Sequence, residues 1–108
     1  MRVVRIQEDA GYDPARFVAR PLIEGDQSNV RIIRLSPGQA LPPHKHGQSD
    51  LMLFVVEGGG ELETPEGVEP FGAGSLAFYR GDEELRVRNA GGEGMTLLAF
   101  LSPKFATR

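Results

Sequence analysis

Hydrophobic residues in this chain form short runs that are separated by turn-forming residues. Several runs are rich in β-branched or aromatic side chains, which is typical of β-strands. The 14 glycines and 8 prolines end nearly every run before it reaches the length of a helix. Strands are therefore expected over residues 3–6, 29–35, a short piece through 44–46, 51–57, 60–64, 75–79, 85–88 and 95–101.

Turn signals complete this outline. One helical turn is expected near the N-terminus, where Asp13 can cap it and Pro14 can occupy its first position, ahead of residues 15–18. The segment 64–67, Thr-Pro-Glu-Gly, supplies proline and glycine for a tight turn between two strands. Strands of this number and spacing favour a sandwich or small barrel, so the fold class is predicted to be all-β.

Alternation assigns faces to some of these strands. In the segment 85–88, Leu85 and Val87 share one face and are expected to point inward, while the two arginines share the other face. The run 51–56 has no polar face and the run 95–101 is similar, so both are expected to be covered on both sides. No helix is long enough to cover them, so other strands or a second subunit must do so. We therefore expect a homodimer.

Composition narrows the class of protein. With 108 residues, 40% of them hydrophobic, the chain can bury one core but not two. The net charge is −3 and the basic residues are scattered, which argues against nucleic acid as a partner. The chain has no cysteine, which excludes disulfides, thiolate nucleophiles and sulfur-ligated metals. No apolar run is long enough for a membrane span or a signal peptide, so a cytoplasmic location is expected.

His44 and His46 are the only histidines in the chain. In an extended strand, residues i and i+2 point to the same side, so two imidazoles at this spacing can converge on one ion or one small ligand. Lys45 between them indicates that the opposite face is in contact with water. We expect both rings to line a cavity of the barrel.

The surroundings of this pair resemble the first signature of the cupin superfamily, Gly-x5-His-x-His-x(3,4)-Glu-x6-Gly. Gly38, His44, His46 and Gly58 have the required spacing, and Leu51 stands where the glutamate belongs. The resemblance implies a cupin-type double-stranded β-helix, a jelly-roll barrel or sandwich. It implies a single cupin domain over residues 1–108, with an N-terminal arm and first strand at 1–28 and the barrel core at 29–102.

The second cupin signature, Gly-x5-Pro-x-Gly-x2-His-x3-Asn, can be placed on Gly74 through Asn89. Arg80 replaces the proline, Asp82 the glycine and Leu85 the histidine. Both signatures are therefore degenerate at positions that carry chemistry in the family.

The resemblance also bears on metal binding. In metal-binding cupins the two histidines of the first signature, its glutamate and the histidine of the second signature hold one divalent transition metal. Here Leu51 and Leu85 take two of these four positions, so no cofactor is expected, although a divalent transition metal stays open as an alternative. Gln48 and Asp50 are the nearest residues that could add an oxygen ligand, but in simple alternation Asp50 faces away from Leu51.

These observations lead to a predicted function with alternatives. The prediction is a protein that binds a small organic molecule next to a degenerate metal site, acting as a binding, sensor or accessory module. The predicted pocket residues are His44, His46, Leu51, Leu53, Leu85 and Val87. One alternative is a metal-dependent enzyme, a dioxygenase or isomerase, that uses the two histidines and a non-standard oxygen ligand. Another is a purely structural dimer module.

A third alternative is acid–base catalysis without metal, as in the sugar epimerases of the cupin fold. Its residues would be one of the histidines, Tyr79, and an acid from Asp82, Glu83 and Glu84. Arginines add a further signal, because an arginine pointing into the cavity would select a carboxylate or phosphate ligand. They are Arg31, Arg34, Arg80, Arg86 and Arg88. Alternation places the last two outside, and Arg80 is the candidate at the barrel rim, in competition with an ion pair to Asp82 or Glu84.

Overall fold

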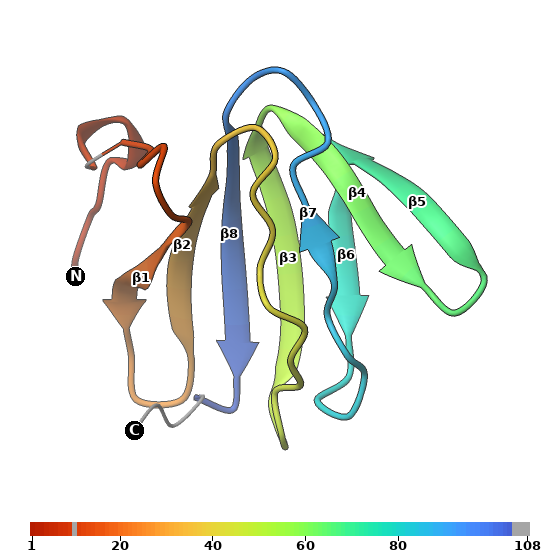
Figure 1. Cartoon of the computed structure of the whole chain (residues 1–108). Coiled ribbons are helices and arrows are strands. Elements are labelled where there is room, and N and C mark those ends of the chain that lie inside the picture. Colours follow the sequence, from red (N-terminus) through yellow and green to blue (C-terminus); the bar gives the residue numbers. More distant parts are fainter. Residues whose placement is uncertain (10, 105–108) are drawn as a thin grey trace.

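The chain folds into two antiparallel sheets that face each other (Figure 1). The computed structural model describes residues 1–9 and 11–104. The larger sheet has the strand order β1-β2-β8-β3-β6 and the smaller one has the order β5-β4-β7. The strands are β1 (Val18–Glu24), β2 (Asn29–Leu35), β3 (Asp50–Glu57), β4 (Gly59–Thr64), β5 (Gly67–Gly72), β6 (Leu76–Tyr79), β7 (Val87–Arg88) and β8 (Met95–Ser102), and a 3-10 helix covers Ile6–Glu8. The all-β prediction is confirmed.

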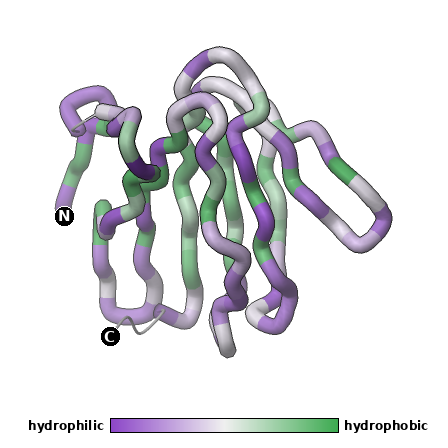
Figure 2. The backbone as a smooth tube through the Cα atoms, in the orientation of Figure 1, coloured by the Kyte–Doolittle hydropathy of each residue, from purple (hydrophilic) through white to green (hydrophobic). Residues whose placement is uncertain are grey.

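The core lies between the two sheets. Alternate residues of β3 and β8 point into it, and the hydropathy colouring shows long green stretches along these two strands (Figure 2). The small sheet and the segment before β7 contribute from the other side. Its largest fully buried apolar members are Leu35, Leu51, Leu53, Val55, Leu85, Met95 and Leu97. Leu85 and Val87 are buried, as alternation predicts, while the arginines beside them are exposed.

Two predictions for the N-terminal region are wrong. Residues 3–6 form no strand, and the 3-10 helix begins at Ile6. The expected helical turn at Asp13 is a tight turn in which the Asp13 carboxylate accepts a hydrogen bond from the Ala15 N–H at 2.8 Å. Asp13 thus bonds the backbone two residues on, but no helix follows, and the chain extends into β1, which pairs with β2.

Two strands, β1 and β5, were not expected from the pattern. Each contains a proline, Pro21 in β1 and Pro70 in β5, and proline cannot donate to a strand ladder. Both strands lie at a sheet edge, where a missing donor is tolerated, and β1 has a register irregularity next to Pro21. Proline therefore marked edge strands here, rather than the absence of a strand.

The strand β3 lies inside its sheet, and within this chain only its inner face is covered, so the expected cover of the outer face by a second subunit stays a prediction. On the outer face, Met52 pairs in register with Phe78 of β6 and with Phe100 of β8. All three side chains are exposed, as is that of Leu76. The outer face of the large sheet therefore carries an apolar row that no described residue covers.

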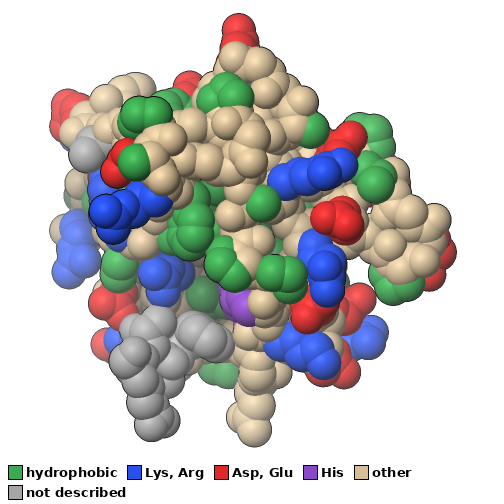
Figure 3. Space-filling model, in the orientation of Figure 1, with side chains coloured by type: hydrophobic (Ala, Val, Ile, Leu, Met, Phe, Trp, Pro, Cys, Tyr) green, Lys and Arg blue, Asp and Glu red, His purple; other side chains and the backbone are tan. Residues whose placement is uncertain are grey.

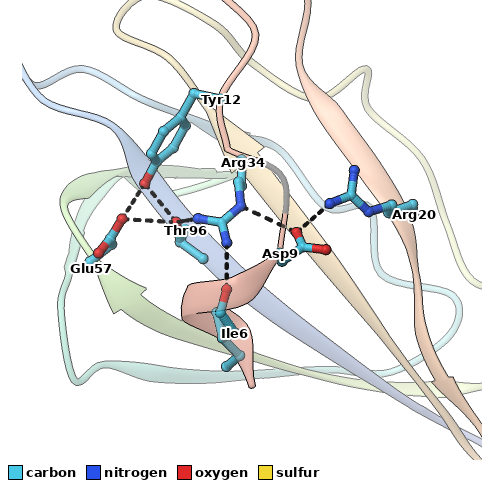
Figure 4. A network of polar contacts seen from close by, with 7 residues as sticks. All are labelled: Ile6, Asp9, Tyr12, Arg20, Arg34, Glu57 and Thr96. Atoms are coloured by element: carbon cyan, nitrogen blue, oxygen red, sulfur yellow. Dashed lines mark hydrogen bonds and ion pairs between the residues drawn. The ribbon is translucent and has the colours of Figure 1, made fainter. Parts of the chain in front are cut away.

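The N-terminal arm, described over residues 1–9 and 11–17, is attached elsewhere on the outer face of the large sheet (Figure 4). The buried guanidinium of Arg34 donates to the Thr96 hydroxyl at 2.9 Å and to the Ile6 carbonyl at 3.1 Å. Asp9 forms ion pairs with Arg34 and Arg20, and the hydrogen bond from Arg20 lowers the pKa of the Asp9 carboxyl.

In the described part of the chain, no helix has the length and apolar character needed to cross a bilayer.

Tyr12 also belongs to this network of polar contacts, and removal of its hydroxyl group is a first testable prediction. Its hydroxyl donates to the Glu57 carboxylate at 2.6 Å and lies 2.6 Å from the Thr96 hydroxyl, and burial raises the pKa of Tyr12. Tyr12→Phe should lower the free energy of unfolding by about 1 kcal/mol, measured by urea denaturation. Tyr79→Phe is the control, because no described residue hydrogen-bonds the Tyr79 hydroxyl. Equal losses in both variants would contradict the prediction.

Candidate functional site

His44 and His46 lie on the segment 36–49, which connects β2 to β3 and crosses in front of the large sheet (Figure 1). This segment pairs with the segment that leads into β7. The His44 N–H donates to the Leu85 carbonyl at 3.4 Å, and the Leu85 N–H donates back at 2.9 Å. The two cupin signatures therefore lie side by side, and Leu85, at the position of the missing histidine, is directly opposite His44.

Gly81 fixes the backbone at His46. Its carbonyl accepts a hydrogen bond from the His46 N–H at 2.9 Å. A Cβ atom on Gly81 would lie only 1.9 Å from the Gly47 carbonyl oxygen, so no larger residue fits here without moving the loop. Gly47 itself has a φ of +64°, which favours glycine. The sequence reasoning missed Gly81, because neither signature asks for glycine at this position.

The two imidazoles meet edge to face. Their ring centroids are 4.4 Å apart and the ring planes are inclined by 62°. The Nδ1 atom of His44 lies 2.9 Å from the Pro42 carbonyl oxygen. Because a carbonyl can only accept, Nδ1 carries a proton in this hydrogen bond, and the lone pair of the uncharged form of the ring then lies on Nε2. His44 thus presents a hydrogen-bond acceptor at Nε2.

His46 is the deeper of the two histidines. It is 5% exposed, whereas His44 lies at the surface. Burial, assisted by the charge of His44, lowers the pKa of His46 to about 4. At neutral pH the inner ring is therefore uncharged.

Both histidines line a pocket with a volume of about 300 Å³. This volume is at the lower end of the range of small-molecule sites. The walls are mostly apolar, and in the space-filling view a patch of histidine surface lies among hydrophobic side chains near the middle of the face (Figure 3). The described lining residues are Phe17, Ala19, Arg31, Ile33, Leu41, Pro42, His44, His46, Leu51, Leu85, Ala99 and Leu101.

The predicted pocket residues divide into two groups. Leu51 and Leu85 line the pocket together with the histidines. Leu53 and Val87 do not: both are buried in the core, because alternation along β3 and β7 places them on the inner face but away from the opening. The buried position of Val87 agrees with the predicted alternation, and neither Leu53 nor Val87 is among the described residues that line this pocket.

The residues present do not fit a transition-metal centre. The described residues contain no group of three or more histidine, cysteine or acidic side chains that could hold an ion. The buried side chains of Leu51 and Leu85 are hydrocarbon at the two positions where metal-binding cupins carry donors. Gln48 and Asp50 are exposed and do not line the pocket, and Asp50 is opposite Ser102 at the start of β3. Two imidazoles are fewer donors than such ions normally take from a protein.

The residues of the acid–base alternative are not brought together. Tyr79, Glu83 and Glu84 line a second cavity beside the β4–β5 hairpin, and neither histidine lines it. Burial, with a smaller effect of Glu83, raises the pKa of Tyr79. Asp82 forms an exposed ion pair with Arg80, 3.3 Å long. A histidine base and a tyrosine acid therefore do not share a cavity here.

Among the arginines, Arg31 rather than Arg80 reaches the pocket. Arg31 shares the inner face of β2 with Ile33, and its register partner on β8 is Ala99, which also lines the pocket. Sequence reasoning did not single it out because β2 has apolar residues on both faces, which hides the alternation. The ion pair of Arg80 with Asp82 was anticipated as the competing interpretation.

Comparisons with known proteins agree with this architecture. The cupin domain model matches residues 31–101. The crystal structure of the TT1209 protein from Thermus thermophilus is 25% identical, with a TM-score of 0.86 over 96% of this chain and 99% of that chain. An RmlC-like cupin protein from Desulfovibrio desulfuricans is 25% identical, with a TM-score of 0.85 over 96% and 98% of the two chains.

A protein from Klebsiella pneumoniae with a double-stranded β-helix domain is 20% identical, with a TM-score of 0.86 over 95% of this chain and 90% of that chain. Among curated proteins, no significant match was found. The family match covers both signatures and most of the two sheets. The chain therefore belongs to the cupin family.

Proposed function

We propose that this cupin binds a small organic molecule in the pocket of His44 and His46 and does so without a metal ion. One observation carries the proposal: the pocket is lined by both histidines, while Leu51 and Leu85 place hydrocarbon where metal-binding cupins place the other donors. An apolar ligand body gains free energy by leaving water for such walls. The protein would act as a binding, sensor or accessory module.

The imidazoles supply polar contacts for orientation. Nε2 of His44 can accept a hydrogen bond from a ligand hydroxyl or amide, because its Nδ1 proton is held by Pro42. The neutral His46 ring adds little charge to the pocket at neutral pH, since its pKa is lowered to about 4. These features favour a mainly apolar ligand with few polar groups.

Neutral fragments test the proposal. Hexanamide and benzamide should shift the NMR signals of pocket residues in the wild-type protein. Ala19→Trp should abolish these shifts, because Ala19 is a half-buried residue of the pocket wall and a large ring there fills the space. Ala73→Trp is the matched control on an exposed turn and should bind like the wild type. Fragments that bind equally to both variants would contradict the proposed site.

We also propose that the chain forms a homodimer through the outer face of the large sheet. The row of Phe78, Met52 and Phe100 crosses three adjacent strands and is exposed. Exposed apolar patches of this kind mark interaction sites. The row contains no charge that would select a partner of opposite sign, so a second copy of the same face is a complementary partner.

Light scattering tests the dimer. At micromolar concentration the wild type should have twice the chain mass of 11.8 kDa. Phe78→Asp should shift the protein to the monomer, because a carboxylate would be placed in the apolar contact. Val68→Asp is the control, since Val68 is 52% exposed, comparable to Phe78 at 54%, but lies on the small sheet. A monomeric wild type would refute the interface.

A further inference from the structure

We propose that the ligand of this pocket is a small apolar carboxylic acid, bound as its carboxylate by Arg31. The inference rests on the proposed function, since it names the chemical class of the molecule in the same pocket. Arg31 lines the pocket and is partly buried. Its guanidinium has no hydrogen bond or ion pair with any residue that the structure describes.

Among the described residues, Arg31 differs in this respect from the other arginines of the two sheets and their connections. From β1 to residue 104, every other arginine forms an ion pair with an acidic side chain. The pairs are Arg20–Asp9, Arg34–Asp9, Arg80–Asp82, Arg86–Glu84 and Arg88–Glu61. Removing a cation from water without a counter-charge is unfavourable. An anionic ligand would supply the missing partner of Arg31.

The orientation of Arg31 follows from the sheet register. In β2 it lies opposite Ala99 of β8 and on the same face as Ile33, and both of these residues line the pocket. No acidic side chain is found among the described residues of the lining. Arg31 is thus the one side chain of this set that is permanently cationic.

The pocket favours a carboxylate over a phosphate. One guanidinium offers one two-pronged donor and one positive charge, which match a carboxylate in geometry and in charge. A phosphate monoester carries a charge closer to two, and its excess would stay uncompensated between apolar walls. The remaining lining, which includes Phe17, Leu51 and Leu101, suits a hydrocarbon or aromatic body.

Matched pairs of acid and amide test the inference. Hexanoate with hexanamide and benzoate with benzamide have nearly the same shape but differ in charge. In the wild type, the dissociation constant of each acid, measured by NMR titration, should be at least about tenfold lower than that of its matching amide. In Arg31→Met the acid and the amide of each pair should bind with similar dissociation constants, because the positive charge is gone. Arg31→Lys should restore part of the preference for the acid, because lysine keeps the charge but not the planar two-pronged donor. Arg80→Met, an exposed arginine outside the pocket, should behave like the wild type.

The outcomes separate the two proposals. If the amides bind and Ala19→Trp blocks them, but the acids bind no better than the amides in the wild type, the carboxylate inference is overturned and the proposed function stands. An acid preference that survives in a folded Arg31→Met variant also overturns it. If neither acids nor amides bind at the pocket, both proposals fail. Tighter binding of phenyl phosphate than of benzoate, lost in Arg31→Met, would overturn the carboxylate assignment in favour of phosphate.

Discussion

The double variant Leu51→Glu, Leu85→His is expected to bind Ni²⁺ or Co²⁺ at least about a hundredfold more tightly than the wild type. The reason is that both positions line the pocket beside His44 and His46, so the substitutions bring the donor number from two to the four of metal-binding cupins. Titration calorimetry gives the affinity, and the visible spectrum of bound Co²⁺ reports its coordination. A folded double variant with wild-type metal affinity would show that the carbon at these positions is not what prevents metal binding.

The same change should couple metal binding to stability. Leu51 is fully buried, so Leu51→Glu without metal should lower the free energy of unfolding by about 3 kcal/mol or more. In the double variant, Ni²⁺ should reverse much of this loss, because the ion binds the folded state only. Leu76→Glu is the control: Leu76 is 64% exposed, and its replacement should change stability little and add no metal dependence.

Acidification from about pH 7.5 to about pH 5 should lower the free energy of unfolding by about 2 kcal/mol through His46 alone. Folded His46 has a pKa of about 4, because burial disfavours the charged ring. In the unfolded chain the same ring titrates at its ordinary pKa of about 6.5. Between these values the unfolded state binds more protons, so stability is complete above the unfolded pKa and is lost as the pH falls toward the folded pKa.

Urea denaturation across this pH range, compared with that of His46→Gln, isolates the contribution. The variant lacks the titrating ring, so its stability should change less over the same window, which lies above the ordinary pKa values of carboxyl groups. An NMR titration of the His46 ring provides a second readout. A His46 pKa near the ordinary value, together with parallel stability profiles of the two proteins, would contradict the buried position of this ring.

The fold could be predicted from the sequence where one strong signal dominated. The apolar runs that became β3 and β8 are central strands, and the spacing of His44 and His46 placed the signatures correctly. The edge strands were missed because their prolines indicate turns when the sheet partner is unknown. Likewise, the run of β3 could not show which of its faces is covered within the chain, since apolar residues occupy both faces whether the cover is a sheet or a second subunit.

The candidate site was predictable in part for similar reasons. The positions of Leu51 and Leu85 in the two signatures predicted that both lie near the histidines, and both line the same pocket. Arg31 could not be found in this way: it belongs to neither signature, and only the strand register shows that it faces the pocket. The role of all these residues in ligand binding stays a prediction.

Elemental analysis of the wild-type protein shows whether the pocket of His44 and His46 holds a metal ion. The protein should be produced in medium containing iron, manganese, nickel and zinc and purified without chelators, alongside His44→Ala. We expect far less than one equivalent of any of these metals in the wild type, with no difference in His44→Ala, because Leu51 and Leu85 leave the two imidazoles without further donors among the described residues. One equivalent of a single transition metal, lost in His44→Ala, would contradict this expectation.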